Sequence, residues 1–183
     1  MIKKLLPVML VMFSATGLFA QTTPQDYPQS KIGEFLDRTG VLVHKQLIDV
    51  GFIRGVRVQT ITATELFSGR KMPGVRFEAA GLGADAATRA SREALIDSDE
   101  LDDLIKTVEM LRSNVFNTFP EPYADVFYTS RDGFSIGGFF AERRWHAVIK
   151  IDKYDSNSPT RDMKPDDFNQ LLDLLQQAKA KLK

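Results

Sequence analysis

The sequence predicts an α+β fold, in which antiparallel sheet carries two amphipathic helices packed on it. Two regions, residues 41–79 and 123–152, contain runs of Val, Ile, Thr and Phe between short turns. Each region precedes a segment whose apolar residues recur at helical spacing. The links between the runs are too short for parallel crossovers, so neighbouring strands should be antiparallel.

Residues 1–20 have the pattern of a secretory signal peptide. Lys3 and Lys4 precede an apolar run over residues 5–13, and small residues lead to an expected cleavage near Ala20. The run is shorter than the ~20 residues of a membrane-spanning helix and contains Pro7. The chain also has no Cys for lipid attachment. We therefore expect a periplasmic or secreted protein.

Cleavage at that point leaves 163 residues, with 22 basic and 24 acidic side chains and a net charge of −2. We interpret residues 21–33 as a flexible polar linker and residues 34–183 as a single α+β domain. The absence of Cys excludes thiol nucleophiles and disulfides. Without a basic block, nucleic acid is not an expected partner. After the signal, no apolar run reaches membrane-spanning length.

The first half of the domain begins with three β-type segments. Residues 41–53 and 55–67 are rich in β-branched and aromatic side chains. After the turn SGRKMPG, residues 75–79 alternate apolar and charged side chains. The stretch GLGADAATRA, residues 81–90, breaks this pattern and predicts a loop, and the REALI segment after it predicts one more short strand.

A helix is expected next. Asp97 as N-cap and Glu100 three residues later have the spacing of a capping box, which satisfies free amide donors. Pro120 and Pro122 end this segment. The apolar positions that form its buried stripe are Leu101, Leu104, Ile105, Val108, Leu111 and Val115.

The second half repeats the plan with three strands, over residues 123–130, 133–141 and 144–152, and a polar loop over residues 153–162. The last helix starts at Pro165, with Asp166 and Asp167 favourably placed for the helix dipole. The apolar stripe of this helix consists of Phe168, Leu171, Leu172, Leu175, Ala178 and Leu182.

The two helical stripes match at a constant offset of 67 residues. This match predicts two strands-then-helix units, residues 34–118 and 121–183, that descend from a tandem duplication. Chance agreement between two amphipathic helices is the alternative explanation. The matched pairs are Ile96 with Met163, Leu101 with Phe168, Leu104 with Leu171, Ile105 with Leu172 and Val108 with Leu175.

Residues 132–151 predict a β-hairpin with a two- or four-residue loop. Because side chains alternate across a strand, the hairpin has one apolar and one mixed face. The glycine at position 138 predicts that a helix crosses closely there. The core face should carry Phe134, Ile136, Gly138, Phe140, Trp145, Ala147, Ile149 and Ile151. The other face should carry Ser135, Gly137, Phe139, His146, Val148, Lys150 and Asp152.

His146 is the best candidate for a catalytic base, and such a base needs a nucleophile and an orienting acid beside it. Ser135 and Asp152 lie on the same predicted face. Ser and Asp are also common on solvated strands, so we assign no catalytic residue. A hydrolase-like enzyme that uses these three residues is the alternative.

Two acidic stretches have some features of calcium sites. Residues 97–103 begin like a calcium loop but have Leu101 and Asp102 where a ligand and a turn glycine are required. Helix N-terminal acids and a solvated turn explain the two stretches better, and we assign no metal site. We also assign no cofactor, because GFSIGG and GLGADA lack the residues of phosphate-binding loops. The candidate ligands of the second stretch are Asp152, Asp155, Asn157 and Asp162.

The layout from Gly40 through DGFSIGG to the final LLDLLQQAKAKL helix resembles a group of small exported proteins of Bacteroidota, as does the GLFAQ end of the signal. The resemblance implies secretion and an α+β domain. This group has no assigned activity, so it transfers no functional residue. The strands-then-helix repeat is also similar to whirly-type single-strand nucleic-acid binders, which use a basic, aromatic-bearing sheet.

The sequence therefore favours an exported, non-enzymatic domain that binds an unknown protein or another envelope component. The basis is that no motif for a nucleophile, metal or cofactor stands out. Single-strand nucleic-acid binding on a sheet face is a weaker alternative, because the exported chain is slightly acidic.

Overall fold

The computed structural model describes residues 28–81, 83–121 and 123–182. Within them the fold is α+β, as predicted, with two four-stranded antiparallel sheets and helices. The predicted signal peptide and residues 21–27 of the predicted linker lie outside the described residues.

The first sheet, sheet A, has the strand order β1-β2-β3-β4. The short helix α2 (Ala86–Arg89) lies in the segment that the sequence predicted as a loop. The strands are β1 (Val43–Ile53), β2 (Val56–Glu65), β3 (Lys71–Ala80) and β4 (Ser91–Asp97), followed by α3 (Leu101–Ser113) and the 3₁₀ turn η1 (Val115–Asn117).

The second sheet, sheet B, has the order β5-β6-β7-β8. Its strands are β5 (Ala124–Thr129), β6 (Ser135–Ala141), β7 (Arg144–Lys150) and β8 (Thr160–Met163), followed by α4 (Pro165–Lys181). The prediction of a loop over residues 153–162 is wrong at its end. The segment TRDM has no strand pattern of its own and is held by its ladder with β7. Each half therefore has four strands and then a helix, while common ancestry remains a prediction.

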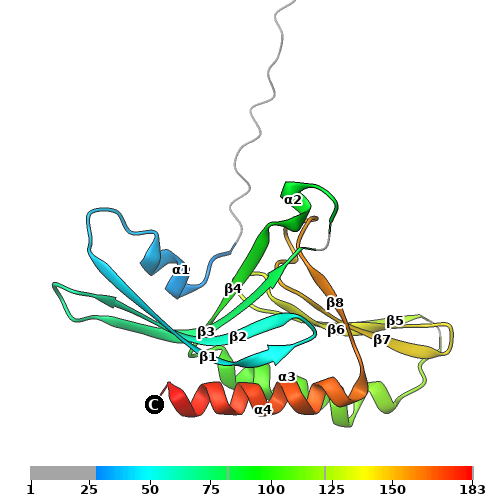
Figure 1. Ribbon diagram of the computed structural model, residues 1–183. Coiled ribbons are helices and arrows are strands. Elements are labelled where there is room, and N and C mark those ends of the chain that lie inside the picture. Colours follow the sequence, from blue (N-terminus) through cyan, green and yellow to red (C-terminus); the bar gives the residue numbers. More distant parts are fainter. Residues whose placement is uncertain (1–27, 82, 122, 183) are drawn as a thin grey trace, which may run out of the picture.

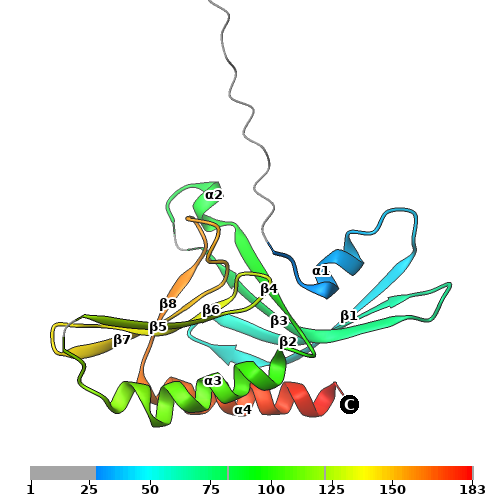
Figure 2. The same cartoon turned by 180° about the vertical axis from the view of Figure 1, so that it is seen from behind.

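The helices α3 and α4 lie side by side under both sheets and run in opposite directions (Figure 1, Figure 2). Lys179 near the end of α4 pairs with Asp102 at the start of α3, 2.5 Å apart. At the other end, Arg112 donates to Asn169 over 2.7 Å. These contacts fix the antiparallel arrangement.

One core joins both sheets to both helices, and the two helical stripes predicted from the sequence face it. Phe77 of β3 stacks on Phe134, just before β6, with ring centroids 4.3 Å apart. Leu174 is also buried, although it lies outside the predicted stripe. It packs against β1 because Gly51 there has no side chain: an added Cβ would lie 2.6 Å from Leu174 Cδ2.

The folded domain begins earlier than the sequence predicted. Ser30 caps the helix α1 (Lys31–Leu36) by accepting the Gly33 N–H, so residues 30–33 do not belong to a flexible linker. Ile32 and Phe35 are buried. α1 covers the face of sheet A that points away from α3 and α4, where Ile32 packs on Ile61 and Leu95 (Figure 1). These apolar contacts hold a segment that looked polar in sequence.

The capping box predicted at Asp97 and Glu100 is only half formed. Glu100 accepts the Asp97 N–H at 3.4 Å, as a capping box requires. The Asp97 carboxylate, however, accepts the N–H groups of Lys31 at 2.8 Å and Ile32 at 3.0 Å. It therefore caps α1, which is distant in sequence, instead of its own helix.

The predicted β6–β7 hairpin is confirmed in register and facing. Phe140 pairs with Trp145, and the loop is the two-residue turn Glu142–Arg143 with positive φ at both positions. The Phe116 ring of η1 lies close to Gly138, where an added Cβ would be 3.1 Å from it. The apolar residues of the core face that are fully buried are Phe134, Ile136, Ile149 and Ile151.

Candidate functional site

The candidate nucleophile Ser135 and the candidate base His146 lie far apart on sheet B. Ser135 pairs with Lys150, whereas His146 pairs with Phe139, four residues further along β6. At the usual rise of a strand this separation is about 13 Å. The Ser135 hydroxyl donates to the Tyr128 carbonyl oxygen at 3.0 Å. The structure therefore does not bring this serine to the histidine.

The candidate acid Asp152 does not orient the histidine either. Its carboxylate accepts the Tyr154 N–H at 2.8 Å, in the turn that follows β7. The His146 ring instead stacks on Phe139, with centroids 5.0 Å apart and an interplanar angle of 8°. Its Nε2 is buried and has no hydrogen-bond partner among the described residues. The three residues of the hydrolase alternative are thus not assembled.

The candidate metal ligands of the 152–162 loop also point to separate partners. Asp155 pairs with Arg92 at 2.7 Å and accepts the Asn157 N–H, and the Arg92 hydrogen bond lowers the pKa of Asp155. Asp162 lies in β8 opposite Val148. Within the described residues, no three His, Asp or Glu side chains are grouped so that they could hold a metal ion.

The other acidic stretch ties three parts of the chain together around Arg131. The Arg131 guanidinium pairs with Asp97 and Asp99, and its backbone N–H donates to Glu100 at 2.9 Å. Asp132 accepts the Leu95 N–H at 2.8 Å, and burial raises the pKa of its carboxyl. This cluster joins α1, the β4–α3 turn and the β5–β6 turn, so its acids serve the fold.

Exposed apolar side chains gather instead around β5 and the segment before it. Phe119 is 79% exposed and Tyr123 is 65% exposed. On β5 itself, Val126 and Phe127 are 40% and 46% exposed. We call these four residues the β5 surface. A local concentration of exposed apolar side chains is a feature of interaction sites.

A groove of about 330 Å³ runs beside this surface on the inner side of sheet B. Trp145 forms one wall and is held by the Phe116 ring, 5.5 Å away, and by its Nε1–H, which donates to the Thr118 carbonyl oxygen at 2.9 Å. The lining is almost entirely apolar. The lining residues are Asn114, Val115, Thr118, Pro120, Ala124, Val126 and Trp145.

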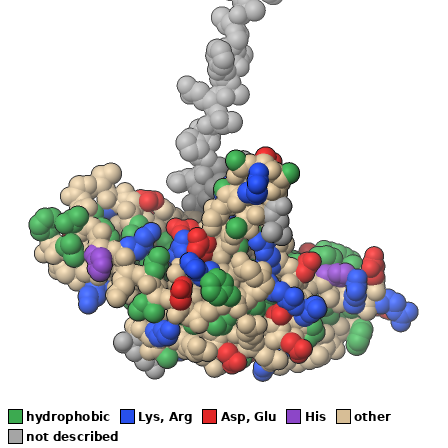
Figure 3. All heavy atoms as spheres, in the orientation of Figure 1, with side chains coloured by type: hydrophobic (Ala, Val, Ile, Leu, Met, Phe, Trp, Pro, Cys, Tyr) green, Lys and Arg blue, Asp and Glu red, His purple; other side chains and the backbone are tan. Residues whose placement is uncertain are grey.

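β5 is an edge strand whose outer side pairs with no other strand in the described part of the chain. In Figure 2, β5 lies at the near edge of its sheet, above α3. At this end of the molecule Figure 3 shows hydrophobic side chains next to Lys, Arg, Asp and Glu side chains. An unpaired edge offers backbone donors and acceptors to another chain.

Two acidic side chains lie on β5 or just before it. Glu121 and Asp125 are both exposed, and neither forms an ion pair within the described residues. Sequence reasoning missed this site because it treated residues 116–127 only as the end of a helix and the start of a strand. The sequence did contain a signal for this site, because aromatic residues are frequent from Phe116 to Phe127, which is unusual for a polar connecting segment.

The outer face of sheet B bears on the nucleic-acid alternative. It carries the aromatic rings of Phe127, Phe139 and His146 across three neighbouring strands. Two acidic residues, Asp125 and Asp162, and two basic residues, Arg144 and Lys150, share this face. The face therefore carries aromatic rings with charges of both signs, whereas single-strand binders combine stacking with a positively charged groove.

Comparison with protein-family models gives no match, and no curated protein or solved structure is significantly similar to the chain. Among the described residues, no helix is long and apolar enough to span a membrane.

Proposed function

We propose that this chain is a non-enzymatic binding domain that adds an extended segment of a partner protein to the free edge of β5. The observation that carries the proposal is that exposed apolar side chains lie on both faces of a strand whose outer edge is unpaired in the described part of the chain. In strand addition of this kind, backbone hydrogen bonds between the strands provide affinity, and pockets for alternate side chains of the added strand provide specificity.

The two faces of β5 define the pattern of the partner segment. Val126 pairs with Gly138 and lines the groove, whereas Phe127 pairs with Gly137 on the opposite face. A strand added at this edge places every second side chain into the groove beside Trp145. The residues between them pass over Phe127 and Asp125, which share a face.

Charge complementarity specifies those intervening residues. Glu121 and Asp125 are acidic and lack ion-pair partners in the described chain. We therefore propose a partner segment that alternates apolar and basic side chains. Because the sequence predicts export, we expect this partner among periplasmic or extracellular proteins.

Trp145 provides a direct test, because it is the only Trp of the chain and lines the groove. We expect an eight-residue peptide of alternating Val and Lys to change the fluorescence of Trp145 in a saturable way. A peptide of alternating Val and Glu should bind at least tenfold more weakly. Equal affinity for the two peptides, or no response to either, contradicts the proposal.

Matched variants locate the site. Val126→Lys introduces a charge on the binding edge and should lower the affinity for the Val–Lys peptide at least tenfold. Phe67→Ser is the control, because Phe67 is 86% exposed and lies in the β2–β3 turn, which belongs to sheet A and not to sheet B. Sedimentation measures whether the chain forms a dimer, in which a second copy would occupy the β5 edge. A dimer that Val126→Lys dissociates would show that β5 pairs with itself, contrary to the proposal.

A further inference from the structure

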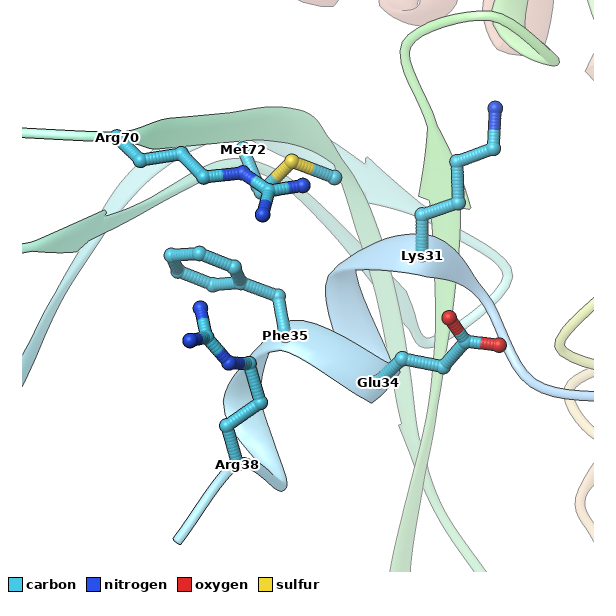
Figure 4. A pocket seen from close by; sticks show the side chains of 6 residues that line it. All are labelled: Lys31, Glu34, Phe35, Arg38, Arg70 and Met72. Carbon is cyan, nitrogen blue, oxygen red and sulfur yellow. The ribbon is translucent and has the colours of Figure 1, made fainter. Parts of the chain in front are cut away.

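A second cavity lies at the other end of the molecule from the β5 surface, between α1 and the start of β3 (Figure 4). Its volume is about 330 Å³. Phe35, which is 4% exposed, and Met72 supply its apolar part. The charged residues of its lining are Lys31, Glu34, Arg38 and Arg70.

Two guanidinium groups flank the Phe35 ring. The Arg38 guanidinium carbon lies 5.7 Å from the ring centroid, and that of Arg70 lies 5.6 Å from it. Figure 4 shows the two side chains reaching the ring from different segments, Arg38 from the turn after α1 and Arg70 from the turn just before β3. Stacking occupies the flat face of a guanidinium and leaves the N–H groups at its rim available.

Of these two arginines, only Arg38 has its charge compensated by a carboxylate in the described part of the chain. Arg38 donates to Glu65 at 3.0 Å. The Arg70 guanidinium pairs with no carboxylate in the described part of the chain, although it faces a cavity. Arg70 is thus an exposed cation whose fork of N–H donors suits a planar, bidentate anion.

We infer that this cavity binds the carboxylate of a small organic anion, with Arg70 as the main contact and Arg38 beside it. Met72, which is half-buried and lines the cavity, is the contact for a short apolar body. Glu34 forms no ion pair within the described residues and lines the same cavity. Its negative charge opposes a second anionic group, so the site favours monocarboxylates over dicarboxylates.

The fixed position of Phe35 in the cavity supports this inference. Phe35 belongs to α1, which Asp97 and Ser30 fix at its first turn. The Phe35 ring beside both guanidinium groups is therefore in place before any ligand arrives.

The test is a titration of the ¹⁵N-labelled protein with butyrate, monitored by amide chemical shifts. We expect saturable shifts in residues 31–38 and 70–72, and no such shifts with butylammonium. Arg70→Gln should weaken butyrate binding at least tenfold. Arg143→Gln removes the same charge from an exposed turn at the far end and should leave the binding unchanged.

Two further arms test the ligand class. Succinate should bind more weakly than butyrate to the natural protein, and Glu34→Gln should reduce that difference. Inorganic phosphate should bind more weakly than butyrate, because it lacks the apolar body. Butyrate shifts that are absent, or that persist unchanged in Arg70→Gln, overturn the inference. The β5 site takes no part in these measurements, so the two proposals can fail separately.

Discussion

Replacing Asp97 with asparagine distinguishes the two roles that this residue could have. If Asp97 were the N-cap of α3, as the sequence alone suggests, asparagine would serve almost equally well, and the stability would barely change. In the structure the Asp97 side chain is only 4% exposed and accepts hydrogen bonds from α1 and from Arg131. Asparagine cannot accept with both of its terminal atoms.

The contacts set the size of the effect. Oδ1 accepts the Ile32 N–H, and Oδ2 accepts the Lys31 N–H and an Arg131 N–H. In Asp97→Asn an amide NH₂ must face at least one of these donors. An unsatisfied buried donor costs about 1–3 kcal/mol, and Arg131 also loses a charged partner. We expect a loss of about 2–4 kcal/mol, a large part of the 5–15 kcal/mol typical of a domain.

Urea denaturation at pH 7 measures this loss. The control is Asp103→Asn, the same chemical change at a side chain that is 70% exposed and pairs only with Lys106. That control should change the stability by less than about 0.5 kcal/mol. Limited proteolysis of Asp97→Asn should also cleave faster after Lys31 and Arg38, because α1 loses its cap. Equal urea midpoints for the two variants would refute the role assigned to Asp97.

Two other predictions concern sheet B and acid stability. Trp145→Ala should cost about 2–4 kcal/mol, because the indole contacts Phe116 and Phe140 and donates a hydrogen bond. His146→Ala should cost less than about 1 kcal/mol, because its buried Nε2 has no partner among the described residues. If His146→Ala lowers the urea midpoint more than Trp145→Ala does, the placement of Trp145 on the core face and His146 on the other face is contradicted. Hydrogen bonds from Arg131 and Lys31 lower the pKa of Asp99 in the folded state. Its contribution is therefore complete above the unfolded pKa of about 3.9 and is lost as the pH falls towards the lower folded pKa. The stability difference between the natural protein and Asp99→Asn should thus shrink from pH 5 to pH 2, and a constant difference argues against this linkage.

The sequence was most informative where a single periodicity recurs along a segment. The stripes of α3 and α4 and the register of the β6–β7 hairpin followed from side-chain spacing, and the buried residues agree. Such patterns are local, because a slip by one residue would expose a whole apolar face. By the same reasoning, the sequence predicted the α+β class and the antiparallel pairing.

Elements that depend on distant partners were not predictable in this way. β8 is a strand because it pairs with β7. α1 is held in place because Asp97 accepts a backbone N–H from its first turn and because its apolar side packs on sheet A. Neither segment carries enough apolar or alternating residues to specify its own structure. The candidate catalytic set failed for a related reason, since a shared sheet face does not set the distance along the strands.

By itself the sequence determined the class of the fold, the buried faces of its main helices and the facing of the central hairpin. Only the tertiary structure decided which strand edges are left unpaired in the described part of the chain and which charges meet. β5 is exposed because the four strands of sheet B pair in chain order and leave it at the edge. Arg70 lies beside Phe35 because α1 packs across sheet A. Both candidate sites thus form where elements distant in sequence come into contact, and the spacing of side chains within one segment does not specify such contacts.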